Sequence, residues 1–175
     1  VVSAMCLTLE GPFRTACEEH FDLNPLKKNE RCFIEVSSFV VDPKCEEDFR
    51  SFLFPLCKLT LELNKIFFKA DFFVTAIPAD DFDYWHSLFL FDKFSEKTVK
   101  FQDFHSNSAI CAFAEIKDLE KRFLHRYGRK PKAHNLHQYL YVQPDARIQV
   151  PSVEEIVREK YTPEMLDYFF NLKST

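Results

Sequence analysis

The sequence predicts an α+β fold, in which a mixed or antiparallel sheet packs with about four to five helices in a single domain. Three observations lead to this prediction. Short runs of β-branched and aromatic residues alternate with segments whose apolar residues have helical spacing. The 175 residues are 46% hydrophobic and 29% charged, a composition typical of a globular domain. No repeat, low-complexity run or linker divides residues 1–175, which we expect to be one globular domain and a piece of a larger or processed chain.

Strands are predicted where apolar residues alternate, or where β-branched and aromatic residues gather. Residues 98–104 and 109–116 are expected to pair as a hairpin. A central strand is expected to begin at Ile66 and to be ended by Pro78. The predicted strands cover residues 1–9, 32–41, 66–77, 98–104, 109–116, 139–142 and 147–150.

Helices are predicted where apolar residues recur every three to four positions between start and stop residues. Asp42 and Pro43 should start one helix, with an acceptor at the N-cap and a proline at the first position. Pro55 should kink or divide this helix because proline lacks an N–H. Gly128 should follow another helix at the C′ position. The predicted helices cover residues 14–21, 42–63, 79–91, 118–127 and 152–160, with a last one from Thr162.

The scarcity of glycine excludes two classes of nucleotide-binding enzyme. The chain has 2 glycines, Gly11 and Gly128, so it contains neither the dinucleotide-binding motif nor the P-loop motif. Both motifs need glycines because a phosphate approaches the backbone closely only where no Cβ intervenes. We therefore expect no nucleotide cofactor.

The 6 cysteines are compatible with a reducing compartment, where they stay free, and with an oxidising one, where they form disulfides. Several lie in apolar patterns, where a free thiol packs as a small hydrophobic group. The chain has no N-x-[ST] sequon and no apolar run long enough to cross a bilayer. We expect an intracellular protein, cytoplasmic or nuclear, with a secreted and disulfide-bridged form as the alternative.

Charge is distributed unevenly along the chain. The formal net charge is -4, yet residues 121–132 hold six cations and no acid. Cations beside aromatic residues are typical of surfaces that bind RNA or an acidic protein, and an aromatic stripe at the chain end is typical of a partner-binding helix. The main prediction is a non-catalytic binding domain that engages a protein or RNA partner, with no cofactor and no membrane partner. The expected contacts are Lys121, Arg122, Arg126, Arg129, Lys130, Lys132, Phe169 and Phe170.

A second hypothesis is a divalent-metal-dependent nuclease. Asp103 is followed at hairpin distance by Glu115-Ile-Lys117, and a helix is predicted next. This arrangement resembles that of nucleases of the PD-(D/E)xK type, although Gln102 replaces the usual proline. A period of two would place Glu115 and Lys117 on one face, where two carboxylates could hold Mg²⁺ or Mn²⁺ while the lysine orients water.

Two residue pairs are weaker metal candidates. Cys17 and His20 have usable ligand spacing, as do His134 and His137. The two pairs are more than a hundred residues apart, and each histidine also fits a half-buried position beside an aromatic residue. We therefore expect no metal site.

Overall fold

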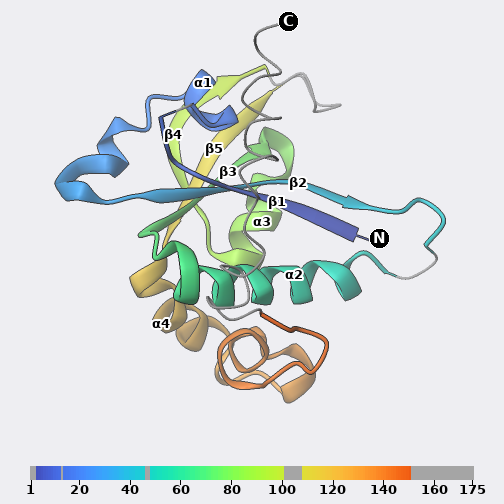
Figure 1. The fold of residues 1–175 in the computed structure, drawn as a ribbon. Coiled ribbons are helices and arrows are strands. Elements are labelled where there is room, and N and C mark those ends of the chain that lie inside the picture. Colours follow the sequence, from blue (N-terminus) through green and yellow to red (C-terminus); the bar gives the residue numbers. More distant parts are fainter. Residues whose placement is uncertain (1–2, 13, 46–47, 101–107, 151–175) are drawn as a thin grey trace, which may run out of the picture.

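A computed structural model of the chain describes residues 3–12, 14–45, 48–100 and 108–150. Within them, a five-stranded mixed sheet packs with helices, which confirms the predicted α+β fold class (Figure 1). Asp103, Phe169, Phe170 and the helices predicted from residue 152 onward lie outside the described residues.

The five strands are β1 (Ser3–Leu9), β2 (Phe33–Val41), β3 (Phe72–Pro78), β4 (Asp92–Val99) and β5 (Ala109–Glu115). Their order in the sheet is β1-β2-β3-β5-β4. Neighbouring strands are antiparallel except β2 and β3, which are parallel because a crossover helix connects them. The predicted hairpin is present as the β4–β5 pair, although β4 begins earlier in the chain than predicted.

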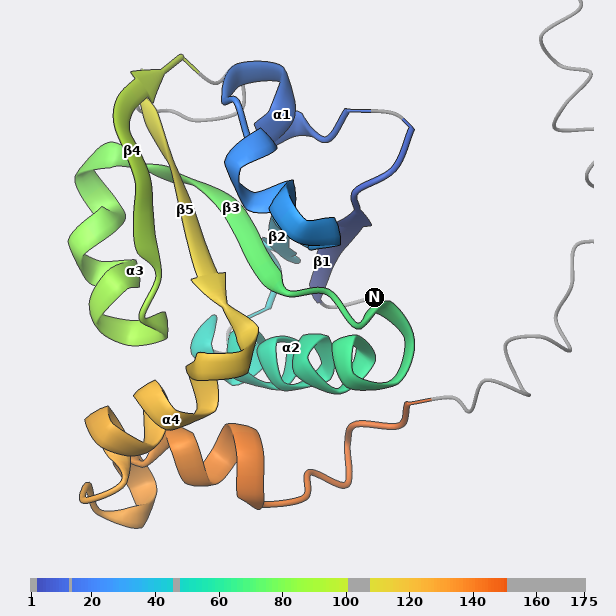
Figure 2. The same cartoon turned by 90° about the vertical axis from the view of Figure 1, so that its left-hand side faces the viewer.

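The α-helices of the described residues are α1 (Ala16–His20), α2 (Arg50–Leu63), α3 (Phe82–Phe89) and α4 (Ile116–Tyr127). Figure 2 shows α1 and α3 on opposite sides of β5, with α2 and α4 below them. In the described part of the chain, no helix combines the length and apolar character that crossing a bilayer requires.

The sheet is buried on both faces, because alternate residues of one strand reach different hydrophobic clusters. Val74 of β3 and Cys111 of β5 pack in the cluster that includes Cys17 of α1. Phe73, the neighbour of Val74, packs in another cluster with Phe123 of α4. Burial on both faces explains why the central strands are apolar throughout rather than alternating with polar residues.

The helix predicted from Asp42 begins only at Arg50. The Asp42 carboxylate accepts the N–H of Lys44 at 2.9 Å, and the Asp42 carbonyl accepts the N–H of Cys45 at 2.9 Å. These bonds form a local turn, which competes with helix capping for the same side chain. Once started, α2 continues through Pro55 as one helix, so the predicted division is wrong.

The predicted central strand is present as β3 but begins at Phe72 rather than Ile66, and the strands predicted at 139–142 and 147–150 are wrong. Residues 64–68 form a π-helical turn before β3, residues 138–142 form another, and residues 147–150 contain no strand. A short apolar run looks alike in a buried helical turn and in a strand, so periodicity cannot separate them. Gly128 does end α4, but at the C-cap position with a right-handed φ of -59°.

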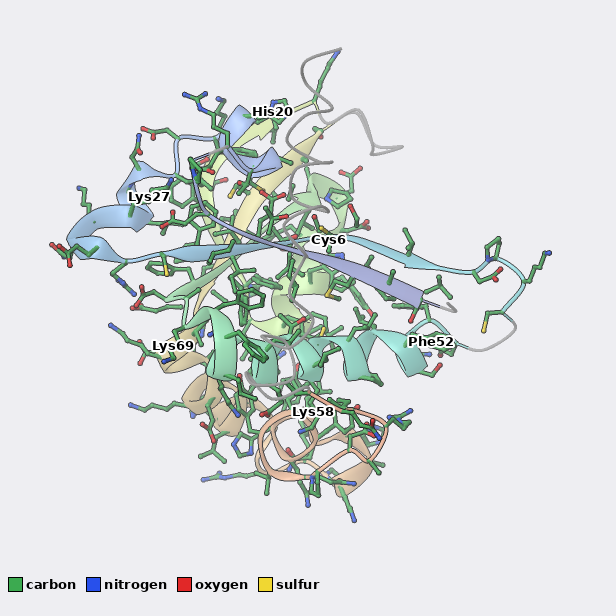
Figure 3. All side chains as sticks on the ribbon, viewed as in Figure 1. Cys6, His20, Lys27, Phe52, Lys58 and Lys69 are labelled. Carbon is green, nitrogen blue, oxygen red and sulfur yellow. The ribbon has the colours of Figure 1, made fainter. Side chains whose placement is uncertain are left out.

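Lys58 attaches the segment after α4 to α2. Its side chain points from α2 toward that segment (Figure 3), and Nζ donates to the carbonyl oxygens of Tyr139 at 2.9 Å and Leu140 at 3.0 Å. The residue is only 6% exposed, and this burial lowers the pKa of the Lys58 ammonium. A buried ammonium requires such acceptors, so the two carbonyls hold the segment in place.

Candidate functional site

The parallel strands β2 and β3 separate soon after they pair. Their register covers Phe33 with Phe72, Ile34 with Phe73 and Glu35 with Val74, although β2 continues to Val41 and β3 to Pro78. Beyond these pairs β2 keeps β1 as its partner and β3 keeps β5. Figure 1 shows β1 and β2 running across the molecule while β3 and β5 run steeply away from them.

We call this feature the fork, formed by residues 36–41 of β2 and 75–78 of β3. Backbone N–H and C=O groups that point into the fork have no partner strand there. Such groups are strong hydrogen-bonding groups, and they are available to an extended molecule that lies between the strands.

An ionic cluster holds the two strands together at the closed end of the fork. The Arg31 guanidinium lies 4.0 Å from the centre of the Phe72 ring, and its Nε is 3.7 Å from Asp71 Oδ1. Arg31 also pairs with Glu115, and the Cys32 N–H donates to Asp71 at 2.9 Å. These contacts join the residues that precede β2 and β3 to the end of β5, so the separation of the strands begins from a fixed base.

A β-bulge lies in the fork. Ala4 pairs with Val40 and Cys6 with Ser37, so one residue of β1 faces two of β2 at Ser38 and Phe39. Ser38 has a φ of 53°, a left-handed conformation that costs a non-glycine residue about 1–2 kcal/mol. Bulges and strained residues of this kind gather beside active sites, where they redirect backbone and side-chain groups.

Glu35 stands at the last pair before the strands separate. It is 3% exposed and is the only buried acid among the described residues. Its Oε2 accepts the N–H of Cys17 at 2.7 Å, in the first turn of α1. This helix forms locally because Thr15 and Glu18 make a reciprocal capping box.

The thiol of Cys17 lies beside the Glu35 carboxylate. A hydrogen bond with Cys111, burial and the negative charge of Glu35 all raise the pKa of Cys17. On the other face of the sheet, burial raises the pKa of Cys57 to about 12. These cysteines therefore stay protonated, and a thiol with a raised pKa is a poor nucleophile. The group at the fork that is suited to accept a proton is the carboxylate.

Aromatic side chains gather where α2 and α3 follow the two fork strands. The Phe54 and Phe89 rings are 6.2 Å apart, and Trp85 stacks on Phe89 at 5.8 Å. Phe49 at the start of α2 and Tyr84 of α3 are exposed. The open end of the fork therefore adjoins apolar surface that a hydrocarbon group could cover.

Of the three proposed nuclease residues, the structure describes Glu115 and Lys117. Asp103 lies outside the described residues. Glu115 ends β5, and Lys117 belongs to the first turn of α4, so the period of two does not extend across them. The Lys117 ammonium lies 2.8 Å from Glu115, and its hydrogen bond, together with that of Arg31, lowers the pKa of Glu115.

The weak metal candidates are not brought together. Cys17 and His20 belong to α1, whereas His134 and His137 belong to the segment after α4, at the opposite end of the molecule (Figure 1). The His137 ring stacks on Tyr141 at 5.7 Å. Across the described ranges, no group of three or more His, Cys, Asp or Glu residues is arranged to hold a metal ion.

The residues predicted to bind a partner differ in whether their side chains are exposed and unpaired. Arg122 is paired with Asp92 at 2.7 Å, so it is not available to a partner. Phe169 and Phe170 lie outside the described residues. The other predicted contacts are all exposed: Lys121, Arg126, Arg129, Lys130 and Lys132.

Sequence reasoning did not identify Glu35 or the fork. One signal was present, because Glu35 is an acid in the apolar half of the run that was correctly predicted as β2. A buried acid within a strand is uncommon and calls for a partner or a function. The separation of two strands, however, has no local signature in the chain.

Comparison with known proteins identifies the family. The family model for N-acyl amino acid synthase FeeM matches residues 1–111. The solved structure of FeeM, an N-acyl amino acid synthase from uncultured soil microbes, is similar with a TM-score of 0.57 and 13% sequence identity. The match covers 69% of this chain and 66% of that chain, so this chain spans just under two thirds of that protein's length. No curated protein matches the chain.

These matches overturn both functional hypotheses from the sequence. A synthase family points to an enzyme, so the prediction of a non-catalytic domain for protein or RNA binding is wrong. The nuclease alternative is wrong for the same reason, because the matched family is described as an N-acyl amino acid synthase. The family model spans residues 1–111 of the 175, and the chain therefore belongs to the N-acyl amino acid synthase FeeM family.

Proposed function

We propose that this chain contains the catalytic core of an acyltransferase, which transfers an acyl group from an activated donor to the amino group of an amino acid. The observation that carries the proposal is the fork, with the buried carboxylate of Glu35 at its closed end. Family membership supports the type of reaction.

The fork is suited to hold the acyl donor. An extended molecule between β2 and β3 would take the place of a missing strand and receive hydrogen bonds from backbone groups. The bulge at Ser38 turns backbone groups of β2 away from regular strand geometry. An N–H directed at the acyl carbonyl would stabilise the negative charge that develops on its oxygen during attack.

Glu35 is suited to act as the general base. An amine attacks a carbonyl only when its nitrogen lone pair is free, so a proton must leave the ammonium form. In the proposed step Glu35 takes one proton from the ammonium group, the nitrogen–carbon bond forms, and the bond from the acyl carbon to the leaving group breaks. The attacking nitrogen then gives up a second proton, which the leaving group takes as it departs, so the amide keeps one N–H. The exposed Phe49 and Tyr84 provide apolar surface for the acyl chain.

The test compares Glu35→Gln with the unchanged chain. Gln keeps the size of Glu35 and can still accept the Cys17 N–H, so the fold should persist. With an acyl thioester and an amino acid as substrates, product measured by mass spectrometry should form about 10²–10⁴ times more slowly. Glu62→Gln, at a partly exposed position near the end of α2, is the matched control and should keep normal turnover.

Two outcomes would count against the proposal. Normal turnover by Glu35→Gln would remove Glu35 from the chemistry. Absence of acyl transfer by the unchanged chain, across thioesters of several chain lengths and the common amino acids, would contradict the function itself. A second variant tests the fork: Ser37→Trp should raise the KM for the donor because the side chain would obstruct the space beside Glu35.

A further inference from the structure

The outer side of α4 and the loop after it carry unpaired positive charge. Five cations there are exposed and make no ion pair with any acid in the described part of the chain. By contrast, Arg122 on the same helix is paired with Asp92. We call this surface the basic face, formed by Lys121, Arg126, Arg129, Lys130 and Lys132.

No acid of the same segment neutralises the basic face. Residues 121–134 contain none. The acid that precedes them, Glu120, lies 3.8 Å from His137. Charge that is concentrated on one side of a helix and its following loop fits a broad anionic surface rather than a small anion in a pocket.

The two larger aromatic residues between the cations, Phe123 and Tyr127, are not available for stacking on nucleic acid bases, and the imidazole of His125 is the exposed ring between them. Phe123 is buried, and its ring packs on Tyr127 at 5.6 Å. The Tyr127 hydroxyl donates to the carbonyl oxygens of Ser87 and Leu88, both at 2.9 Å. Single-stranded nucleic acid binding relies on exposed aromatic platforms, and Phe123 and Tyr127 do not supply one on the basic face.

An exposed apolar residue lies among the cations instead. Leu124 is 53% exposed on α4, whereas Leu119 and Phe123 on the same helix are buried against the core. Cations around an apolar side chain on a surface helix are typical of segments that rest on a bilayer. Phosphate headgroups pair with the cations while the apolar side chain enters the acyl region.

We propose that the basic face binds the surface of an anionic lipid bilayer. This replaces the earlier expectation of no membrane partner, and it is independent of the acyl-transfer proposal, because lipid binding is measured without substrates. The occupant is the lipid surface rather than an acidic protein, since a bilayer offers phosphate headgroups to the cations and, directly beneath them, an apolar region that the exposed Leu124 can enter.

The experiment measures co-sedimentation of the full chain with lipid vesicles. Vesicles of phosphatidylcholine with phosphatidylglycerol should bind the protein at low salt, and pure phosphatidylcholine vesicles should not. Each cation near an anionic surface changes partitioning by about fivefold. The triple variant Arg129→Gln, Lys130→Gln, Lys132→Gln lies outside α4 and should bind about 100-fold more weakly. Leu124→Ala should bind a few-fold more weakly.

A matched control removes the same net charge elsewhere. Lys28, Lys44 and Lys100 are exposed on other parts of the molecule, and their triple Gln variant should bind as the unchanged chain does. Equal binding by both triple variants, or equal binding to charged and uncharged vesicles, would overturn the proposal. So would binding of polyglutamate or a single-stranded oligonucleotide through the basic face without vesicle binding.

Discussion

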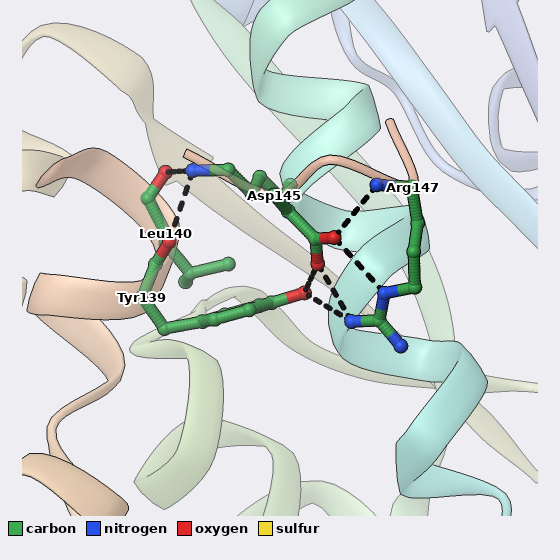
Figure 4. Close-up of polar contacts among 5 residues, drawn as sticks. Tyr139, Leu140, Asp145 and Arg147 are labelled. Atoms are coloured by element: carbon green, nitrogen blue, oxygen red, sulfur yellow. Dashed lines mark hydrogen bonds and ion pairs between the residues drawn. The ribbon is translucent and has the colours of Figure 1, made fainter. Parts of the chain in front are cut away.

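Removal of the Lys58 ammonium should loosen the segment at residues 138–147 and destabilise the protein. Figure 4 shows the contacts concerned: Lys58 donates to the carbonyls of Tyr139 and Leu140, while the Tyr139 hydroxyl donates to Asp145 at 2.8 Å. Arg147 donates to the same carboxylate at 2.6 Å, and its hydrogen bonds are the main cause of the lowered pKa of Asp145.

The magnitude follows from the two bonds of the ammonium. Hydrogen bonds to charged groups contribute about 1.5–3 kcal/mol each, so two correspond to about 3–6 kcal/mol. Burial of the charge, which lowers the pKa of Lys58, offsets several kcal/mol of this. We expect Lys58→Met, which keeps the aliphatic stem, to lower the free energy of unfolding by about 2 kcal/mol. Lys58→Ala should cost about 4 kcal/mol because it also removes buried methylene groups at about 0.8 kcal/mol each.

Urea unfolding measures the loss of stability, and hydrogen exchange of the amides at 138–147 measures the loosening of that segment. These amides should exchange faster in Lys58→Met than in the unchanged chain, while those of β3 and β5 keep their relative order. Lys93→Met is the control, because Lys93 lies on β4, is exposed, and makes a pair with Glu96 at 3.4 Å that contributes less than about 1 kcal/mol. An unchanged urea midpoint together with unchanged exchange would refute the reasoning.

Three other changes can be predicted from single contacts. Burial and the hydrogen bond to Asp145 raise the pKa of Tyr139 to about 12, whereas the unfolded value is near 10. The stabilisation by Tyr139 is therefore present below about pH 10 and is lost as the pH rises toward 12. Over that range the thermal midpoint of the unchanged chain should fall relative to that of Tyr139→Phe, and parallel curves for the two proteins would contradict this prediction. Gly128→Ala should destabilise by about 1–3 kcal/mol, since a Cβ there would lie 2.5 Å from the Leu124 carbonyl oxygen, whereas Gly11→Ala meets nothing within 4 Å and should shift the urea midpoint little. Phe123→Ala should lower the free energy of unfolding in urea by about 3–5 kcal/mol, because the side chain is buried in the core. A smaller loss than the truncation of an exposed residue causes would exclude a role of Phe123 in the core.

Local sequence patterns predicted an element correctly where its residues alone favour one secondary structure. The alternation in residues 1–9 and the apolar run at 32–41 correctly predicted β1 and β2, and the periodicity of 118–127 predicted α4. Patterns failed at 139–142, where the deciding contact comes from Lys58, a residue far away in the sequence. They also failed to place Lys117, because β5 ends at Glu115 and α4 begins at the next residue, so Lys117 is helical.

By itself, the sequence determined the α+β class and excluded phosphate-binding glycine loops, because periodicity and the lack of glycine act on neighbouring residues. Only the tertiary structure decided that β2 and β3 pair over three residues and then separate. It also decided that Glu35 is buried at this point against α1. Parallel strands meet through a crossover, so the geometry between them depends on packing around α2 rather than on any local pattern.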